Sequence, residues 1–288
     1  MLPVLIGVLA LGAGCVLYGV LIEHSWYRLV RCRIDILPAD APGTITVLHL
    51  SDLHFKARDG KKARFLAGLP AADVTVVTGD FLAEPGGVET AVGAVRTCRG
   101  GIASWFVLGS NDYFVPRPLN YFAYFRKERR TRRAERGRAA DLRDQLTADG
   151  WADLTNSRRS VELAGTPTEL LGLDDAHIYR HDFRAAPREA PERFGFAVMH
   201  SPDSAPETAA LGYEFIVSGH THGGQVCLPW VGALVTNSSM PRRLVKGLIR
   251  IGGAVMYQSP GLGTSKFAPF RFWCRPEAAF LELHPRKS

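Results

Sequence analysis

The chain has 288 residues, a hydrophobic content of 46% and a formal net charge of +7. Disordered chains have low hydrophobicity, and repeat proteins show a fixed sequence period. The hydrophobic content of 46% argues against a disordered chain, and no repeated period indicates a repeat protein. About 250 residues follow the apolar N-terminal segment, which is enough for one large α/β domain or two small ones.

The N-terminal segment LPVLIGVLALGAGCVLYGVLI (2–22) contains no charged residue. A helix rises about 1.5 Å per residue, so this length spans the roughly 30 Å core of a bilayer. A signal peptide needs a basic residue before the apolar run, and none is present. A lipoprotein signal is disfavoured because Gly12 stands where leucine is usual before Cys15, and a buried core helix is rare at this position. We predict one transmembrane helix over residues 1–23 and a juxtamembrane linker over 24–43.

The residues after this helix indicate its orientation. Arg28, Arg31 and Arg33 follow Trp26 and Tyr27, which lie where an interfacial aromatic belt is expected. By the positive-inside rule this end is cytoplasmic. The five cysteines form no CxxC motif and no disulfide framework, which agrees with a reducing compartment. We predict a single-pass protein of the cell membrane whose domain lies in the cytoplasm.

Five β-rich segments share one design, in which an apolar run stops at a polar or glycine-containing motif. They are TITVLHLSDLH (44–54), DVTVVTGD (73–80), WFVLGSND (105–112), FGFAVMH (194–200) and YEFIVSGHTH (213–222). The helices predicted between them cover residues 61–69, 87–98, 140–149 and 203–211. This alternation predicts a layered α/β domain over residues 44–288. Open α/β sheets bind ligands outside the carboxyl ends of their strands, so we expect the five motifs to converge on one site.

The stretch RKERRTRRAERGRAADLR (126–143) holds nine basic and three acidic residues, which is most of the net charge. One interpretation is a patch for anionic lipid head groups, where each basic residue contributes about 1 kcal/mol. A solvated excursion is the alternative. No aromatic residues are interleaved to stack on bases. We therefore predict the membrane surface as the partner of this stretch and regard nucleic acid as disfavoured.

The motifs carry the residue types of a metal site. Carboxylates and imidazoles together suit Mn, Fe or Zn better than Ca or Mg, which prefer all-oxygen shells. The candidates are too many for one tetrahedral ion and fit two divalent metal ions that share a bridging carboxylate. Residues i and i+2 of an extended segment face the same way, which pairs Asp52 with His54 and His220 with His222. The candidate ligands are Asp52, His54, Asp80, His200, His220, His222 and one member of the group Ser110, Asn111 and Asp112.

Each of these motifs is weak by itself, since a single histidine is usually a core or surface residue. Together and in this order, SDLH, TGD, GSND, MHSP and GHTHGGQ resemble the calcineurin-like metallophosphoesterase superfamily. The N-terminal helix and the complete GHTHGGQ resemble its membrane-associated bacterial branch, which includes enzymes like UDP-2,3-diacylglucosamine pyrophosphatase. The resemblance covers residues 44–284.

The resemblance implies a four-layered α/β/β/α sandwich with two metal ions at the strand ends. It implies that Asp80 bridges the ions and that a metal-bound hydroxide attacks phosphorus in line. Asp52, His54 and His222 would hold the first ion, and His200 and His220 the second. The candidates for contacts around this centre are Asp174, Asp175 and Gln225. His49 faces away from His54 and is predicted to be a core histidine.

The motif GSND departs from the pattern GNHD of this superfamily, in which the asparagine binds the second ion and the histidine protonates the leaving group. Aligned without a gap, Ser110 takes the ligand position and Asn111 the histidine position. A small loop shift instead brings the carbonyl oxygen of Asn111 to the ion, and we favour this because a hydroxyl is the poorer ligand. A turn-shaping role of Asn111 is the alternative. Neither residue is a general acid near neutral pH, so His177 or His181 remains as a substitute donor.

The predicted function is a membrane-anchored phosphohydrolase with two metal ions that cleaves phosphoester or pyrophosphate bonds of a lipid-linked or nucleotide-linked substrate. The residues predicted to take part in catalysis are Asp80, Asn111, His200 and His222. Without a proton donor, leaving groups of low basicity such as phosphate are favoured over alkoxides. A nuclease or cyclic nucleotide phosphodiesterase is one alternative, because a fold does not fix its substrate. A metal-binding module with weak catalysis is the other.

Overall fold

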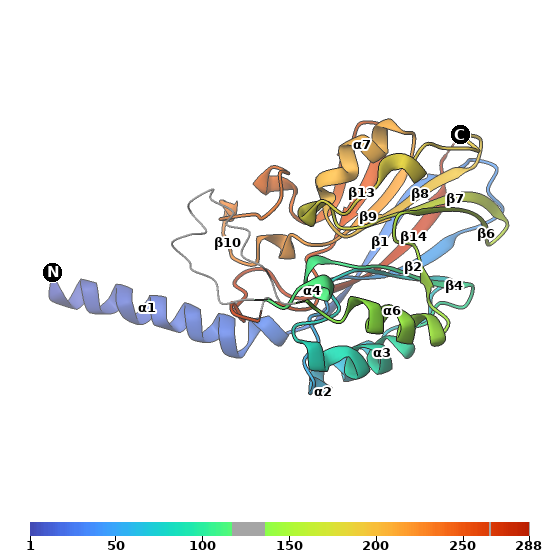
Figure 1. The fold of residues 1–288 in the computed structure, drawn as a ribbon. Helices are drawn as coiled ribbons and strands as arrows, with labels where there is room; N and C mark the ends of the chain where they lie inside the picture. Colours follow the sequence, from blue (N-terminus) through green and yellow to red (C-terminus); the bar gives the residue numbers. More distant parts are fainter. Residues whose placement is uncertain (117–135, 265, 288) are drawn as a thin grey trace.

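The computed structural model describes residues 1–116, 136–264 and 266–287. Two six-stranded sheets pack against each other, and helices cover both outer faces (Figure 1). The first sheet consists, in spatial order, of β1 (Arg28–Leu37), β14 (Glu277–Pro285), β2 (Ile45–Leu50), β3 (Val74–Thr78), β4 (Ala103–Val107) and β5 (Ala152–Asp153). The second consists of β12 (Gly247–Ile251), β13 (Ala254–Gln258), β9 (Phe215–Ser218), β8 (Phe194–Met199), β7 (Thr166–Leu173) and β6 (Ser157–Leu163).

The helices and a small hairpin complete the described part of the fold. The α-helices are α1 (Leu2–Leu21), α2 (Gly60–Ala67), α3 (Val88–Arg96), α4 (Ser110–Tyr113), α6 (Ala139–Ala148) and α7 (Ala205–Ala210), and the hairpin is formed by β10 (Cys227–Leu228) and β11 (Gly232–Ala233). Helices α2, α3 and α6 cover the first sheet and α7 lies over the second (Figure 1). The predicted α/β/β/α sandwich is confirmed. The helices predicted over 61–69, 87–98, 140–149 and 203–211 correspond to α2, α3, α6 and α7.

Three hydrophobic layers hold the sandwich together. The central layer lies between the sheets, where Val47 and Val76 of the first meet Phe196 and Phe215 of the second. A second layer lies between the first sheet and its helices, and a third between the second sheet and α7. Full burial of each such Val or Phe side chain stabilises the fold by about 1.5–3 kcal/mol. The strands are therefore apolar on both faces, which explains their continuous apolar runs.

Strand β1 corrects the prediction of a linker over residues 24–43. Residues 28–37 form an edge strand that runs parallel to β14, with Arg28 opposite Glu277. Ile34 and Ile36 are buried, whereas Arg33 and Asp35 on the other face are exposed. An edge strand with one charged face reads as a linker in the sequence because its apolar half is short. The sheet therefore begins at residue 28 and not at residue 44.

The three arginines that indicated the orientation of the helix all form ion pairs on this strand. Arg28 Nη2 lies 2.7 Å from Glu277 Oε2, and Arg33 Nε lies 2.9 Å from Asp35 Oδ1. Arg31 lies 3.5 Å from Glu282 and stacks over Phe280. Their charge is compensated within the domain. They are therefore weaker indicators of the cytoplasmic side than the sequence suggests.

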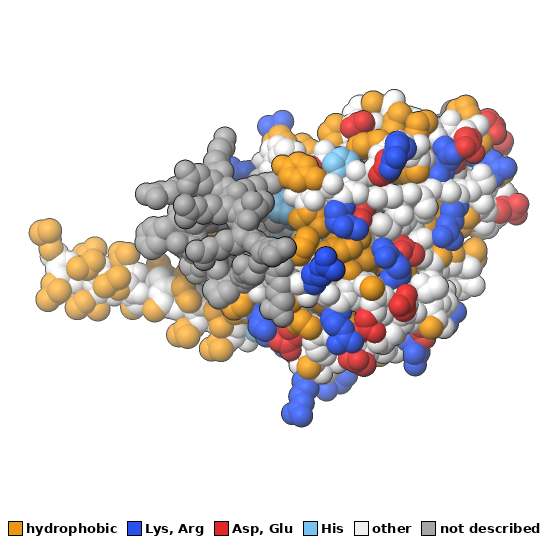
Figure 2. All heavy atoms as spheres, in the orientation of Figure 1, with side chains coloured by type: hydrophobic (Ala, Val, Ile, Leu, Met, Phe, Trp, Pro, Cys, Tyr) orange, Lys and Arg blue, Asp and Glu red, His pale blue; other side chains and the backbone are white. Residues whose placement is uncertain are grey.

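Helix α1 projects from the domain and is apolar on all sides (Figures 1 and 2). Residues 2–25 form one candidate membrane span by length and hydropathy. Its end is fixed to the segment 270–274. The buried carboxylate of Glu23 accepts hydrogen bonds from the backbone N–H groups of Trp273 (2.9 Å) and Cys274 (2.6 Å), and the ring of Tyr18 meets Phe272 edge-on. The helix is therefore held against the domain and not tethered by a free linker.

The predicted basic stretch 126–143 lies partly outside the described residues. Its described part starts at Arg136, and residues 139–143 belong to α6. Arg138 pairs with Asp141, and Arg143 lies 2.5 Å from Asp153. The two arginines are thus compensated by carboxylates, and the membrane role of the whole stretch stays a prediction.

Candidate metal centre

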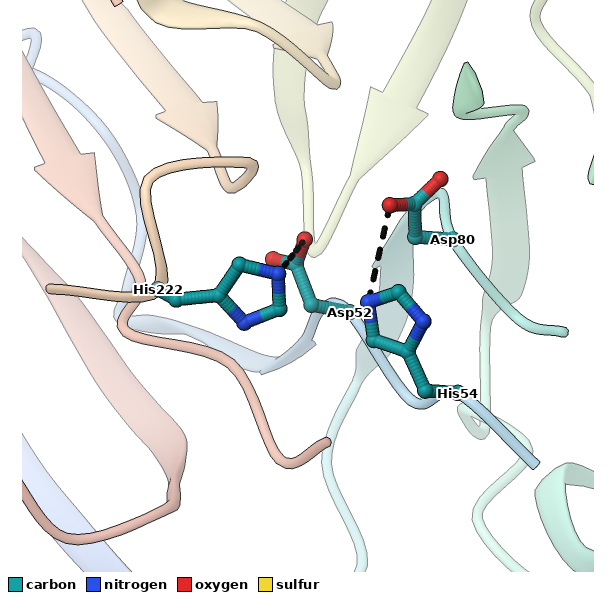
Figure 3. Close-up of side chains that lie close together, drawn as sticks. All are labelled: Asp52, His54, Asp80 and His222. Carbon is teal, nitrogen blue, oxygen red and sulfur yellow. Dashed lines mark ion pairs between the residues drawn. The ribbon is translucent and has the colours of Figure 1, made fainter. Parts of the chain in front are cut away.

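Four predicted ligands converge where the strands of the two sheets end. Asp52 and His54 follow β2, Asp80 follows β3 and His222 follows β9. Their ligand atoms all lie within 4.8 Å of one another. His54 Nε2 is 3.5 Å from Asp80 Oδ2, and His222 Nε2 is 3.6 Å from Asp52 Oδ1 (Figure 3). The structure thus brings together the proposed first-ion ligands and the proposed bridging carboxylate.

After the strand ends the backbone takes left-handed conformations, which direct these side chains into the site. The φ angles are +48° at Asp52, +45° at His54, +55° at Asp80, +71° at His220 and +51° at His222. Such values are uncommon for residues other than glycine and cluster at functional sites. The sequence predicted that the pairs Asp52/His54 and His220/His222 lie on extended segments. β2 ends at Leu50 and β9 at Ser218, so both pairs lie beyond the strands. They face the same site because the chain turns sharply at each of them.

Two glycines permit the close approach of the loops. A Cβ atom at Gly219 would lie 1.8 Å from Ser51 Oγ and 2.6 Å from Asp52 Oδ2. A Cβ atom at Gly109 would lie 2.4 Å from Asp80 Oδ1. All three distances are shorter than a Cβ atom can approach, so a larger residue at either position would displace a carboxylate of the site.

The residues fit a metal ion because several buried ring nitrogens of the predicted ligands have no hydrogen-bond partner in the described part of the chain. Both ring nitrogens of His54, Nε2 of His220 and Nδ1 of His222 are buried and have no hydrogen-bond partner among the described residues. Buried polar atoms are almost always paired, and imidazole nitrogens beside carboxylates are ordinary ligands of transition metals.

A second group of predicted ligands lies close to the same carboxylate oxygen of Asp80. His200 Nε2 lies 3.7 Å from Asp80 Oδ2 and 3.2 Å from Nδ1 of His220. His200 Nδ1 lies 2.6 Å from the carbonyl oxygen of Thr78, a hydrogen bond that directs Nε2 into the site. The backbone N–H of His220 donates to Asp52 Oδ2 at 2.9 Å. Of the two histidines proposed for the second ion, His200 therefore lies beside Asp80, and His220 lies beside His200.

The GSND loop reaches the centre through Asn111. The backbone N–H of Asn111 donates to Asp80 Oδ1 (2.8 Å), and its side-chain amide donates to Asp80 Oδ2 (2.5 Å). Asp112 is buried and accepts from the N–H groups of Gly109 and Asp80, both at 3.0 Å. Asn111 is therefore the residue of this loop whose side chain contacts the predicted bridging carboxylate.

Carboxylates surround His200 in the site. Burial alone would lower the pKa of His200, but Asp80, Asp175 and Asp52 outweigh burial and raise it to about 10. Burial, followed by the charge of Asp80, raises the pKa of Asp112 to about 8. Carboxylates gathered in a low-dielectric interior favour a cation among them, which a divalent metal ion supplies.

Asp174, Asp175 and Gln225, which the sequence suggested for contacts around the centre, have different surroundings in the structure. Asp175 is buried, and burial raises its pKa to about 6. Asp174 accepts hydrogen bonds from Tyr113 and Arg180, both at 2.9 Å. Gln225 donates to the carbonyl oxygen of Ala268 at 2.8 Å, so its side chain fixes a loop.

The structure also gives the positions of the three histidines that the sequence analysis singled out but did not assign as ligands. The ring of His177 lies 4.3 Å from that of His220, whereas His181 stacks edge-on against Phe183. His177 is therefore the better placed of the two substitute proton donors. His49 is buried and lies 2.9 Å from Thr78 Oγ1, as expected for a core histidine.

Two buried cations support the site and were missed in the sequence. Lys62 Nζ donates to the carbonyl oxygen of Leu53 (2.5 Å) and to Asp59 Oδ2 (2.8 Å), which fixes the loop that carries His54. Arg271 is fully buried and donates to the carbonyl oxygens of Pro260 (2.7 Å) and Gly263 (2.6 Å). No local pattern distinguishes these two cations from surface residues, because only the tertiary fold buries them.

Comparison with known proteins agrees with this geometry. The family model of the calcineurin-like phosphoesterases matches residues 45–224. The uncharacterized metallophosphoesterase YkoQ of Bacillus subtilis (strain 168) is 26% identical over 255 residues, covering 86% of both chains. The phosphodiesterase YaeI of Escherichia coli (strain K12) is 25% identical over 268 residues, covering 91% of this chain and 90% of YaeI.

A bovine relative extends the comparison to membrane proteins. The Bos taurus transmembrane protein with metallophosphoesterase domain is 25% identical over 264 residues, covering 83% of this chain and 53% of that protein. The matched family segment contains four of the five motifs in full, the first six residues of GHTHGGQ, and all seven residues of the centre described above. The chain therefore belongs to the calcineurin-like phosphoesterase family and is a metal-dependent phosphoester hydrolase.

Proposed function

We propose that the protein is a membrane-anchored phosphohydrolase with two divalent metal ions, and that it cleaves phosphoester or pyrophosphate bonds of a lipid-linked or nucleotide-linked substrate. The observation that carries this proposal is the cluster of Asp52, His54, Asp80 and His222, with His200 3.7 Å from the same Asp80 oxygen that His54 approaches. Asp52, His54 and His222 hold the first ion, and Asn111, His200 and His220 hold the second. Mn, Fe or Zn suits this ligand set. Bound there, the ions activate water and neutralise phosphoryl charge.

The chain's own residues prepare this chemistry. His200 is oriented by the carbonyl oxygen of Thr78, and Asp80 is oriented by the backbone N–H of Asn111. For Asn111 to serve as a ligand, its amide rotates so that the oxygen and not the NH₂ group faces the cation. Asp112 stabilises the GSND loop by accepting hydrogen bonds from the backbone N–H groups of Gly109 and Asp80.

The GSND loop supports a preference for good leaving groups. Asn111 offers an amide, which does not donate a proton near neutral pH, where the pattern GNHD has a histidine. General acid catalysis contributes about 10²- to 10⁴-fold, and this matters most for alkoxide leaving groups. We therefore propose that pyrophosphates and aryl esters are cleaved in preference to alkyl phosphodiesters.

The first test is hydrolysis by the full chain in detergent. We expect turnover of bis(4-nitrophenyl) phosphate and of a nucleotide-lipid pyrophosphate with Mn²⁺, and complete loss on chelation that Mn²⁺ reverses. Metal content measured on the same samples distinguishes the alternatives. Two bound ions without turnover of either substrate would contradict the proposal and favour a metal-binding module. A preference for nucleic acid with a steep salt dependence would favour a nuclease.

We further propose that the domain faces the cytoplasm. Exposed Lys56, Arg58 and Lys61 lie beside the end of α1, where the positive-inside rule places cytoplasmic charge. The five cysteines are free, as in a reducing compartment. A reporter fused to the C-terminus tests this orientation. Alkaline phosphatase activity of that fusion, which requires export, would contradict it, whereas green fluorescence is the expected result.

A further inference from the structure

Two neighbouring depressions lie between the end of α1 and the metal centre. The basic depression, with a volume of about 260 Å³, has walls formed by Lys56, Arg58, Lys61, Lys62, Lys266 and the predicted ligand His54. The apolar depression, with a volume of about 500 Å³, is formed by Leu21, Ile22, Trp26, Tyr27 and Phe65. Ser25, Tyr27 and Lys61 line both, so the two depressions adjoin each other.

The basic depression carries positive charge that the described residues do not compensate. Lys62 pairs with Asp59 at 2.8 Å, and Lys266 pairs with Glu84 at 2.9 Å. Lys56, Arg58 and Lys61 are exposed and have no acidic partner within the described part of the chain. Figure 2 shows Lys and Arg side chains (blue) beside the apolar helix where it meets the domain. Three uncompensated cations next to a phosphoester-cleaving centre form a site for an anion.

The apolar depression is continuous with the surface of the candidate membrane span. Leu21, Ile22 and Trp26 expose 67%, 53% and 49% of their surface. Tyr27 packs on Phe65 with ring centroids 5.2 Å apart, and both rings line the apolar depression. An apolar wall at the level where a membrane helix leaves the bilayer accepts an acyl chain, while a water-soluble substrate gains nothing from it.

Building on the proposed function, we infer that the substrate is an anionic phospholipid that carries a second anionic group besides the phosphoryl group that is cleaved. The second anion binds Lys56, Arg58 and Lys61. The acyl chain lies against Trp26, Tyr27 and Phe65. This arrangement lets the scissile phosphoryl group reach the centre beside His54 without leaving the membrane surface.

Kinetics of the full chain in detergent test this inference with three substrates: short-chain CDP-diacylglycerol, CDP-glycerol, and bis(4-nitrophenyl) phosphate. The first two share their head group and differ in the acyl chains. We expect kcat/KM to be at least about tenfold higher for CDP-diacylglycerol than for CDP-glycerol. Trp26→Ala should remove most of this difference. Equal values in the wild type would indicate a nucleotide-linked substrate and overturn the inference.

The basic depression is tested with Lys56→Gln/Arg58→Gln. Loss of two charge-assisted contacts should lower kcat/KM for CDP-diacylglycerol, relative to that for bis(4-nitrophenyl) phosphate, by about tenfold or more. The matched control is Arg243→Gln/Arg250→Gln, which removes the same charge from exposed positions outside the depression. This control should leave the ratio unchanged. An unchanged ratio in the Lys56/Arg58 variant, or an equal fall in the control, would overturn the inference.

Binding without turnover separates this inference from the proposed function. An undecyl phosphate brominated at its chain end should quench Trp26 in metal-free protein, as measured by comparison with Trp26→Phe. Quenching should exceed that by the corresponding brominated alcohol, and Lys56→Gln/Arg58→Gln should remove the excess. No excess in the wild type would refute the site. The expected excess, found with a protein that turns over none of the three substrates, would instead leave the site in place and reject the proposed function.

Discussion

Asp80→Asn should reduce kcat by at least about three orders of magnitude. The Asp80 carboxylate lies within 3.7 Å of His54 and His200 and accepts two hydrogen bonds from Asn111, so both ligand groups depend on it. An amide has the same shape but one neutral oxygen, and it cannot bridge two cations. Stabilisation of transition-state charge by bound ions contributes several kcal/mol, and each 1.36 kcal/mol is about tenfold in rate.

The measurement for this variant is kcat on bis(4-nitrophenyl) phosphate together with metal content by mass spectrometry. Asp73→Asn is the matched control, because Asp73 precedes the same strand at its opposite end and bonds to Thr46 at 2.7 Å. The control should keep its two ions and most of its activity. An Asp80→Asn protein with two ions and at least a tenth of the wild-type kcat would show that Asp80 does not bridge them.

The second large effect concerns the GSND loop. Ser110→Asn/Asn111→His creates the pattern GNHD, which combines an amide ligand with a proton donor. We expect cleavage of an alkyl phosphodiester to rise by about 10²- to 10⁴-fold, the usual contribution of general acid catalysis. The aryl diester should gain far less, because its leaving group needs no proton. The reason lies in the position of Asn111, whose side chain reaches Asp80 Oδ2 at 2.5 Å.

Ser110→Asn alone is the control for this variant, since it changes the ligand and adds no proton donor. It should leave the ratio of alkyl to aryl diester cleavage near that of the wild type. The pH–rate profile of the double variant should gain a basic limb, because a donor histidine loses its proton near its ordinary pKa of about 6.5. A double variant with bound metal but no gain on the alkyl diester would mean that the loop does not determine leaving-group preference.

Much of the candidate site could be predicted from the sequence because ligand chemistry is a local property. The carboxylates and imidazoles of Asp52, His54, Asp80 and His222 are ordinary ligands of transition metals, so their residue types indicate a metal site. Their position after apolar runs places them at strand ends, since parallel strands end at a common edge. The uninterrupted apolar run of α1 likewise follows from composition alone.

Other features could not be predicted, because they depend on pairings between distant segments. Residues 28–37 read as a linker, yet β14, about 250 residues further along the chain, recruits them into the first sheet. The sharp turns at the ligands appear only in the backbone, where φ is positive at Asp52 and His54. Sequence spacing had assigned these residues to an extended strand.

The sequence by itself indicated the residue types of a metal site, the phosphoester-hydrolase family and an apolar N-terminal helix, because these depend on residue type and short-range order. Only the tertiary structure decided that Asn111 meets Asp80, that Arg271 and Lys62 are buried supports, and that a basic depression beside His54 adjoins an apolar one. Each of these depends on contacts or burial that the packing of several segments produces. Such contacts are selected by packing of the whole fold and not by any local preference.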